Sequence, residues 1–236
     1  MTAPHLDNPE VQRVLEDILE MSQRDAAVIQ NAQSIVAGWA EKPSYAQMSD
    51  LCQDAALPVR PDVGRLIYML ARSLPARRIV EFGTSFGASL IYLASAVRDN
   101  GFGSVIGTEM NEHKIARAKA NLARAGLEDH IRIVAGDARE TLADLPAPID
   151  LVLLDGWKEL YLEVLVVLEP KLRDRSVIVA DNLSMLPRSY LDHVRDPRRG
   201  YVSISLPLGD GIELSMRQLS AASSTRSSAR PPQGES

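Results

Sequence analysis

Residues 79–90 of the chain read Ile79-Val80-Glu81-Phe82-Gly83-Thr84-Ser85-Phe86-Gly87-Ala88-Ser89-Leu90. An apolar run leads into a loop with two glycines and then into a helical pattern, as expected for a buried strand, a turn and a helix. Glycines in such a loop let the backbone approach a ligand, and the helix amides point into the crevice beyond the strand ends. The stretch therefore predicts a cofactor-binding loop in an α/β fold.

After Pro75, the sequence alternates between strand and helix patterns. Strands are expected over residues 78–82, 104–109, 131–135, 150–155 and 176–181, and a hairpin over residues 201–206 and 211–216. Such alternation predicts a parallel sheet with helices on both faces, to which the hairpin adds an antiparallel edge. The expected fold is a Rossmann-like, doubly wound, mostly parallel sheet of seven strands, preceded by N-terminal helices.

The segment before Pro75 has helical spacing throughout. Asn8 and Pro9 open a first helix, and further helices are expected over about residues 25–39, 45–56 and 62–74. We expect three regions: an N-terminal helical cap (residues 1–57), a cofactor-binding domain (58–219) and a disordered tail (220–236). The cap is expected to roof the substrate pocket or to form the interface of a homodimer.

Composition narrows the function classes. The 236 residues include 26 Lys and Arg against 31 Asp and Glu, and the resulting net charge of −5 disfavours binding to nucleic acid. The single cysteine, Cys52, excludes an internal disulfide and a multi-cysteine zinc site. The start lacks the pattern of a secretory signal, and no apolar run approaches the about 20 residues of a membrane span. We therefore expect a cytoplasmic protein with no membrane association.

Acidic residues around the loop distinguish between two cofactors. A dinucleotide site uses G-x-G-x-x-G, but here Ser85 occupies the place of the middle glycine, and Glu81 would repel a pyrophosphate. S-adenosylmethionine has no phosphate and carries a sulfonium and an amino group, which suit a nearby carboxylate. Glu109 ends the next strand, where it can hold the ribose hydroxyls, and the pair Asp137-Ala138 is placed to approach the adenine. S-adenosylmethionine is the expected cofactor.

Oxygen-bearing side chains follow the fourth and fifth expected strands. Asp155 follows one strand, and Asp181 and Asn182 follow the other. Adjacent parallel strands would bring the three together at one edge, beside the cofactor crevice. Carboxylate and amide oxygens favour Mg²⁺, and no Cys or His has the spacing of a zinc site. The alternative for Asn182 is an ordinary turn residue.

The sequence resembles the metal-dependent catechol-type O-methyltransferases, within the class I fold for S-adenosylmethionine. The resemblance covers about residues 59–216 and rests on the motifs E-F-G-T-S-F-G-A-S (81–89), D-G-W-K-E-L-Y (155–161) and A-D-N (180–182). The chain departs from the family at Gly156, where a histidine is usual, and a late carboxylate has no clear match near Ile204. Both departures concern the acceptor, not the metal or the methyl donor.

The resemblance implies roles for individual residues. Asp155, Asp181 and Asn182 would hold Mg²⁺, and Lys158 would be the base that receives the proton of the substrate hydroxyl. Trp157 would lie against substrate and cofactor. The full set of expected cofactor contacts, which includes residues already named, is Val59, Glu81, Gly83, Ser89, Glu109, Asp137, Ala138, Asp155 and Trp157.

The expected function is Mg²⁺-dependent transfer of a methyl group from S-adenosylmethionine to a hydroxyl of a small, catechol-like molecule with vicinal oxygens. Chelation by the metal lowers the pKa of such a hydroxyl, and a lysine completes its deprotonation. One alternative is an NAD-type Rossmann oxidoreductase, which the missing middle glycine disfavours. The other is a non-catalytic S-adenosylmethionine-binding module, which the intact Asp155, Lys158, Asp181 and Asn182 disfavour.

Overall fold

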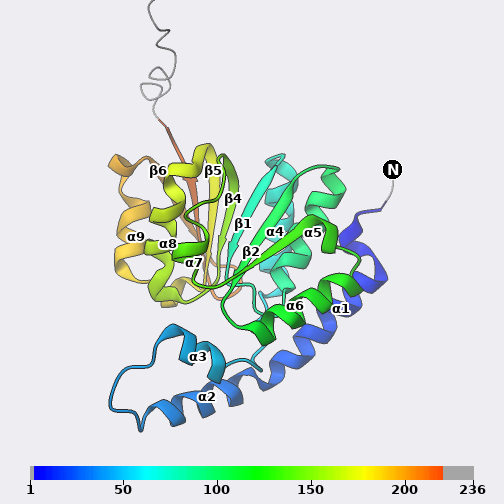
Figure 1. Ribbon diagram of the computed structural model, residues 1–236. Coiled ribbons are helices and arrows are strands. Elements are labelled where there is room, and N and C mark those ends of the chain that lie inside the picture. The colour runs from blue at the N-terminus through cyan, green and yellow to red at the C-terminus, as the bar shows by residue number, and fades with distance from the viewer. Residues whose placement is uncertain (1–2, 220–236) are drawn as a thin grey trace, which may run out of the picture.

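The structure, a computed structural model, describes residues 3–219, and the expected disordered tail (220–236) lies outside them. Its seven strands are β1 (Arg78–Phe82), β2 (Ser104–Glu109), β3 (Ile131–Ala135), β4 (Ile149–Leu154), β5 (Leu172–Asp181), β6 (Tyr201–Leu206) and β7 (Ile212–Arg217). They form one sheet in the order β3-β2-β1-β4-β5-β7-β6 (Figure 1). Neighbours from β3 to β5 are parallel, and β7 is antiparallel to both β5 and β6. The expected doubly wound sheet with an antiparallel hairpin is confirmed.

Helices cover both faces of the sheet (Figure 1). One layer contains α1 (Pro9–Met21), α4 (Pro61–Ser73), α5 (Ala88–Asn100) and α6 (Glu112–Arg124). The other contains α7 (Ala138–Thr141), α8 (Tyr161–Leu168) and α9 (Arg188–Arg195). Because α5 packs against α1, α4 and β2, all residues from 88 to 97 are buried. The helix that follows the glycine loop is thus held firmly on the central strands.

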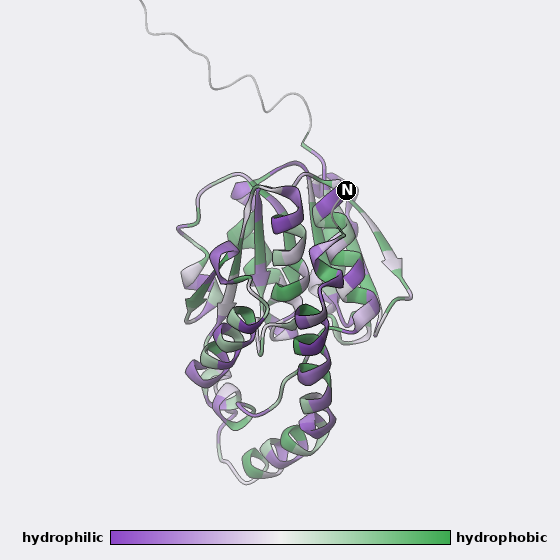
Figure 2. Ribbon diagram, turned by 90° about the vertical axis from the view of Figure 1, so that its right-hand side faces the viewer, coloured by the Kyte–Doolittle hydropathy of each residue, from purple (hydrophilic) through white to green (hydrophobic). Residues whose placement is uncertain are grey.

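Two further helices, α2 (Asp25–Val36) and α3 (Tyr45–Leu51), lie outside these layers. Figure 2 shows them extending from the lower end of the molecule, with α1 leading into α2. In α2, only Asp25 and Ala32 are buried. Both helices lie within the segment named above as the cap, residues 1–57.

Some elements differ in length from the expectation. The helix expected over 25–39 ends at Val36, where the amides of Gly38 and Trp39 turn to carbonyls three residues back and the glycine has a low helix propensity. The helix expected over 45–56 ends at Leu51, since the buried Asp25 carboxylate accepts the amides of Ala56 and Leu57 and draws that segment away. Strand β5 begins at residue 172, four positions early, through an irregular pairing with β4.

Candidate active site

The glycine loop after β1 lies against the end of β4. Gly83 has a φ of +99°, in the region that L side chains rarely adopt. A Cβ atom at this position would lie 2.5 Å from the amide nitrogen of Gly156 and 2.6 Å from the carbonyl oxygen of Asp155. Glycine therefore permits the close approach of the two segments. Strand order reverses between β1 and β4, which is where open α/β sheets bind ligands.

Glu81 is a fully buried carboxyl group at this position. Its Oε2 accepts a hydrogen bond from Thr84 Oγ1 at 2.7 Å, whereas its Oε1 has no partner among the described residues. Burial raises the pKa of Glu81 to about 8; the hydroxyls of Ser89 and Thr84 oppose this rise, and the charges of Asp155 and Glu109 add to it. This surplus of acidic groups suits a positively charged ligand, which would restore the ionised form of Glu81.

Glu109 ends β2 at the same edge of the sheet and is held by backbone amides. Its Oε2 accepts the N–H of Ser85 at 2.9 Å, and its Oε1 accepts the N–H groups of Met110 at 2.8 Å and Asn111 at 3.0 Å. The side chain is half-buried. A carboxylate in this position retains lone pairs that can accept a bond from a hydroxyl pair.

The three residues expected at the metal lie at the ends of β4 and β5. The two strands pair in register, with Leu154 opposite Ala180, which places Asp155 beside Asp181. Asn182 follows with a φ of +62°, a conformation that asparagine tolerates, and its N–H donates to Asp181 Oδ1 at 2.8 Å. The expected juxtaposition of these three residues is therefore present in the fold.

The two carboxyl groups of this trio lie where ionisation is unfavourable. Burial raises the pKa of Asp181 to about 7, and the charge of Asp155 adds to the rise. Burial also raises the pKa of Asp155, against the opposing effect of Lys158. Within residues 3–219, no three His, Cys, Asp or Glu side chains are grouped in the manner of a metal site. A cation here would thus depend on two carboxylates and the Asn182 amide.

Lys158 lies beside these acids with a nearly buried side chain, 14% exposed. Its Nζ donates to Asp155 Oδ1 at 3.0 Å and to the hydroxyl of Tyr161 at 2.8 Å. Tyr161 is fully buried, and its hydroxyl donates to the backbone oxygen of Asp181 at 3.4 Å. The lysine amine is consequently held at the acidic cluster from two sides.

Asp137 and Ala138, expected near the adenine, lie at the start of α7. Asp137 caps this helix by accepting the N–H of Arg139 at 2.9 Å, and the Arg139 guanidinium also pairs with it at 2.7 Å. The hydrogen bonds from Arg139 lower the pKa of Asp137. Ala138 is buried. The carboxylate thus has a helix-capping role in addition to any contact with a ligand.

The remaining expected residues come from three different elements. Ser89 is buried in the first turn of α5, and Val59 is buried in the segment that joins the cap to α4. Trp157 is half-buried and packs against Tyr45 of α3, with ring centroids 5.9 Å apart. The cap therefore contributes an aromatic wall next to the acidic cluster.

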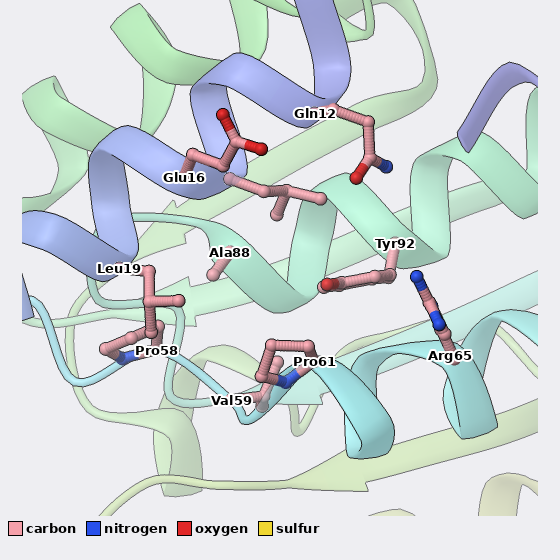
Figure 3. Close-up of a pocket in the computed structure, with 10 residues that line it drawn as sticks. Gln12, Glu16, Leu19, Pro58, Val59, Pro61, Arg65, Ala88 and Tyr92 are labelled. Carbon is pink, nitrogen blue, oxygen red and sulfur yellow. The ribbon is translucent and has the colours of Figure 1, made fainter. Parts of the chain in front are cut away.

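A cavity of about 200 Å³ opens between α1, residues 58–61, α4 and α5 (Figure 3). Val59, Arg65, Ala88 and Tyr92 lie in its wall, and Figure 3 shows them on the elements that surround the opening. The acids at the strand ends do not line it. The cavity therefore lies away from the acidic residues at the carboxyl edge, and Val59 is the expected residue that lines it.

Sequence reasoning missed three polar or aromatic residues of this region. Thr84 and Tyr161 stand inside the quoted motifs, yet their contacts with Glu81 and Lys158 depend on how the loops fold back. Tyr45 gives no local signal, because its partner Trp157 is more than one hundred residues away in the chain.

A family of known proteins matches the part of the chain that holds most of these residues. Residues 80–183, which span β1 to the start of the loop after β5, match a family model described as a methyltransferase domain. The chain is thus similar to methyltransferases over this part of its length. Its resemblance to the catechol-type branch, first drawn from the motifs, is likewise confirmed by the relatives found.

Two relatives of this chain carry the name catechol O-methyltransferase. The protein from Mycobacterium tuberculosis is 34% identical over 139 residues, which cover 57% of this chain and 61% of the relative. The protein from Niastella koreensis is 33% identical over 132 residues, covering 54% and 59%. The matched part of the chain thus spans about three fifths of the length of these relatives.

Solved structures agree on the fold. A cofactor-bound protein from MTB, Rv0187, is 27% identical, has a TM-score of 0.62 and is covered to 95%, against 79% of this chain. The O-methyltransferase TomG from Streptomyces achromogenes, solved with SAM, has a TM-score of 0.63 at 24% identity, with 82% and 98% covered. Among residues 3–219, no helix has the length and apolar character that a bilayer span requires.

Proposed function

We propose that the chain is an Mg²⁺-dependent O-methyltransferase, which moves a methyl group from S-adenosylmethionine to one of two vicinal hydroxyls of a small, catechol-like molecule. The observation that carries the proposal is that three carboxyl groups, of Glu81, Asp155 and Asp181, lie together at the carboxyl edge. Their pKa values are raised, and the positive side chains among them are too few to balance their charge. A cationic donor and a divalent metal would together neutralise this cluster. Relatives named catechol O-methyltransferase support the same reaction.

The donor site fits S-adenosylmethionine. Glu81, with its unpartnered Oε1, would face the positively charged methionine end, and Gly83 leaves the space that a side chain would fill. Ser89 and Val59 would flank the same end. Glu109, already oriented by backbone amides, would accept the ribose hydroxyls. When bound, the donor supplies an electrophilic methyl group. The protein's task is to align it with the acceptor oxygen.

The metal site fits Mg²⁺ through hard oxygen donors. Asp155, Asp181 and Asn182 would hold the ion, which supplies Lewis acidity toward the acceptor oxygens when bound. The two aspartates would gain from a bound cation, because its charge would favour the ionised form that burial disfavours at both side chains and that the charge of Asp155 further disfavours at Asp181. Among residues 3–219, no third His, Cys, Asp or Glu is grouped with the two aspartates as a metal ligand, so the proposed site depends on the Asn182 amide.

The acceptor would lie between the acidic cluster and the cap. Lys158 would take the hydroxyl proton at Nζ, which Tyr161 and Asp155 hold in place. Trp157 and Tyr45 would close the pocket against one face of a planar acceptor and exclude water. We also propose that the cap forms a separate roof over the domain of residues 58–219 and that the protein is a homodimer. Its proposed location is cytoplasmic, without nucleic-acid or membrane partners.

The test is calorimetric titration of the full chain with S-adenosylhomocysteine, with and without Mg²⁺, followed by an activity assay with catechol. We expect binding of S-adenosylhomocysteine, and methyl transfer that EDTA abolishes and Mg²⁺ restores. Full activity in EDTA would exclude the metal assignment. Binding of NADH in place of S-adenosylhomocysteine would favour the oxidoreductase, and donor binding without turnover on any vicinal diol would favour a non-catalytic module.

A further inference from the structure

A buried lysine outside the proposed chemistry lies next to the donor site. Lys114 of α6 is only 5% exposed. Within the described part of the chain, its Nζ makes one hydrogen bond, to Ser85 Oγ at 3.2 Å. An ammonium group taken out of water is unfavourable unless several partners compensate it, so one neutral hydroxyl is poor compensation. Lys114 is therefore an unusual residue to retain for packing alone.

The charged surroundings of Lys114 point toward the donor site. Burial lowers its pKa, while Glu109, Cys52 and Asp25 act in the opposite direction. Of these groups, Glu109 is the carboxylate proposed to hold the ribose. A cation buried near it compensates the charge that Glu109 brings into the crevice.

Ser85 links the lysine to this carboxylate. Its backbone N–H donates to Glu109 Oε2 at 2.9 Å, and its hydroxyl donates to the backbone oxygen of Ala56 at 2.9 Å. Ser85 has a φ of +46°, which is strained for a residue with a side chain. The hydroxyl contacts to Lys114 and Ala56 compensate this strain, and so keep the amide directed at Glu109.

The cap holds the same segment from the other side. Asp25 of α2 accepts the N–H groups of Ala56 and Leu57, each at 2.7 Å. Leu57 is also strained, with a φ of +41°. A buried acid and a buried base thus fix the two sides of one junction, at which the cap meets the glycine loop.

We propose that Lys114 is a positioning residue of the methyl-donor site: its ammonium fixes Ser85, and the Ser85 amide holds Glu109 in the orientation that accepts the ribose hydroxyls. This inference rests on the proposed function, because it takes Glu109 as the ribose ligand. It adds a residue of α6 that contacts neither the metal cluster nor Lys158. A positioning role of Lys114 can be distinguished from a packing role, because it affects binding of the ribose and of no other part of the donor.

The test compares Lys114→Met with Lys119→Met, an exposed lysine on the same helix, in the full chain. Each protein is titrated calorimetrically with S-adenosylhomocysteine and with its 2′,3′-dideoxy counterpart, which lacks both ribose hydroxyls. For Lys114→Met, we expect the Kd of S-adenosylhomocysteine to rise about tenfold, as for loss of one charge-assisted interaction. The Kd of the dideoxy compound should stay at the wild-type value. Lys119→Met should match the wild type with both ligands.

Thermal melting gives a second readout. Methionine replaces the buried ammonium with an apolar group of similar length, so the ligand-free Lys114→Met protein should melt at or above the wild-type temperature. Ser85→Ala removes the hydroxyl link but leaves the amide, and should show the same ribose-specific loss to a smaller extent. In a Glu109→Gln background, Lys114→Met should cause no further loss.

Two results would overturn the inference. One is a Lys114→Met protein that binds S-adenosylhomocysteine as the wild type does. The other is equal weakening for both ligands, which would assign Lys114 to general packing. If Lys114→Met does not fold, Ser85→Ala carries the same two-ligand comparison, and an equal loss there also overturns it. A wild-type chain that binds no S-adenosylhomocysteine instead overturns the proposed function, and this inference with it.

Discussion

Two aspartates at opposite ends of β4 have contrasting environments. At the amino end, Asp150 is 4% exposed, and its Oδ2 accepts the N–H groups of Arg77 at 2.7 Å and Arg78 at 2.9 Å, while Arg173 pairs with its Oδ1. At the carboxyl end, Asp155 has Lys158 as its cationic partner and a second carboxylate, Asp181, as its neighbour. The folded chain itself supplies the hydrogen bonds and the cation that Asp150 needs. The carboxyl group of Asp155, by contrast, is placed to bind a ligand that the chain does not supply.

The contrast separates structural from functional acids within one strand. A buried carboxylate that accepts several N–H groups stabilises the fold, and its loss leaves donors unpaired. A buried carboxylate beside another one opposes folding and is retained for a ligand. Composition alone could not distinguish the two, because both are aspartates that flank the same apolar strand.

The largest expected effect separates these two residues. Asp155→Asn should abolish methyl transfer while leaving the thermal stability of the ligand-free protein unchanged or higher, because it removes one of two repelling carboxyl groups. Asp150→Asn should cost about 2 kcal/mol of unfolding free energy and leave turnover per folded molecule intact. Denaturant unfolding and single-turnover rates check both. Loss of stability in Asp155→Asn, or of turnover in Asp150→Asn, would contradict the contrast.

The next effect concerns the partner of Asp155. As a general base, Lys158 should contribute a factor on the order of 10²–10⁴ to kcat, so Lys158→Ala should lower kcat far more than donor affinity. Lys158→Arg keeps the positive charge but does not take up a proton near neutral pH, and should stay impaired. Higher pH should partly rescue both variants. A Lys158→Arg enzyme that runs at the wild-type rate across the pH range would make the lysine an electrostatic residue only.

A smaller effect is expected at the donor carboxylate. Glu109→Ala removes the acceptor proposed for the ribose hydroxyls, which should weaken S-adenosylhomocysteine binding by about 1.5–3 kcal/mol for each charged hydrogen bond lost. The affinity for Mg²⁺ should stay constant, since Glu109 lies at the end of β2 and not in the acidic cluster. Calorimetry on the folded variant measures both. Unchanged donor affinity would exclude Glu109 from the site.

The smallest effect is expected in the pH dependence of stability, to which Glu81 and Glu213 contribute with opposite signs. Burial raises the pKa of Glu81 to about 8 from an ordinary value of 4.5, so its contribution to stability is complete below the ordinary value and is lost as pH rises through about 8. For Glu213, burial also acts upward, but hydrogen bonds from Arg195 and Ser205 outweigh it and lower the pKa. Its contribution is therefore present above the ordinary value and is lost as the medium becomes more acidic.

Melting temperatures of the ligand-free protein across the pH range test this pair. Glu81→Gln should flatten the fall in stability between pH 5 and about 8, and Glu213→Gln should flatten the fall on acidification. A wild-type slope in Glu81→Gln would mean that another group titrates there. Asp181, whose pKa is raised to about 7, is the first candidate.

Much of the fold could be predicted from local patterns. The bounds expected for β1, β2, β3 and β6 agree with the structure to the residue, because apolar runs there are bordered by glycines, prolines or polar turns. The start of β5 could not be predicted, since residues 172–175 include three charged side chains and join the sheet only through irregular pairing with β4. The end of α3 likewise depends on Asp25, whose partners lie about thirty residues further along the chain.

The sequence by itself determined which chemical groups stand at the strand ends and that parallel strands would bring them to one edge. The geometric pairing of Asp155 with Asp181 follows from that rule, because strand polarity places all carboxyl ends together. Only the tertiary structure decided which acids are neutralised and which are not. The contacts of Lys114 with Ser85 and of Tyr45 with Trp157 join distant segments, and no local pattern encodes the distance between them. Burial and long-range contacts, which set pKa values and side-chain orientation, exist only after the chain has folded.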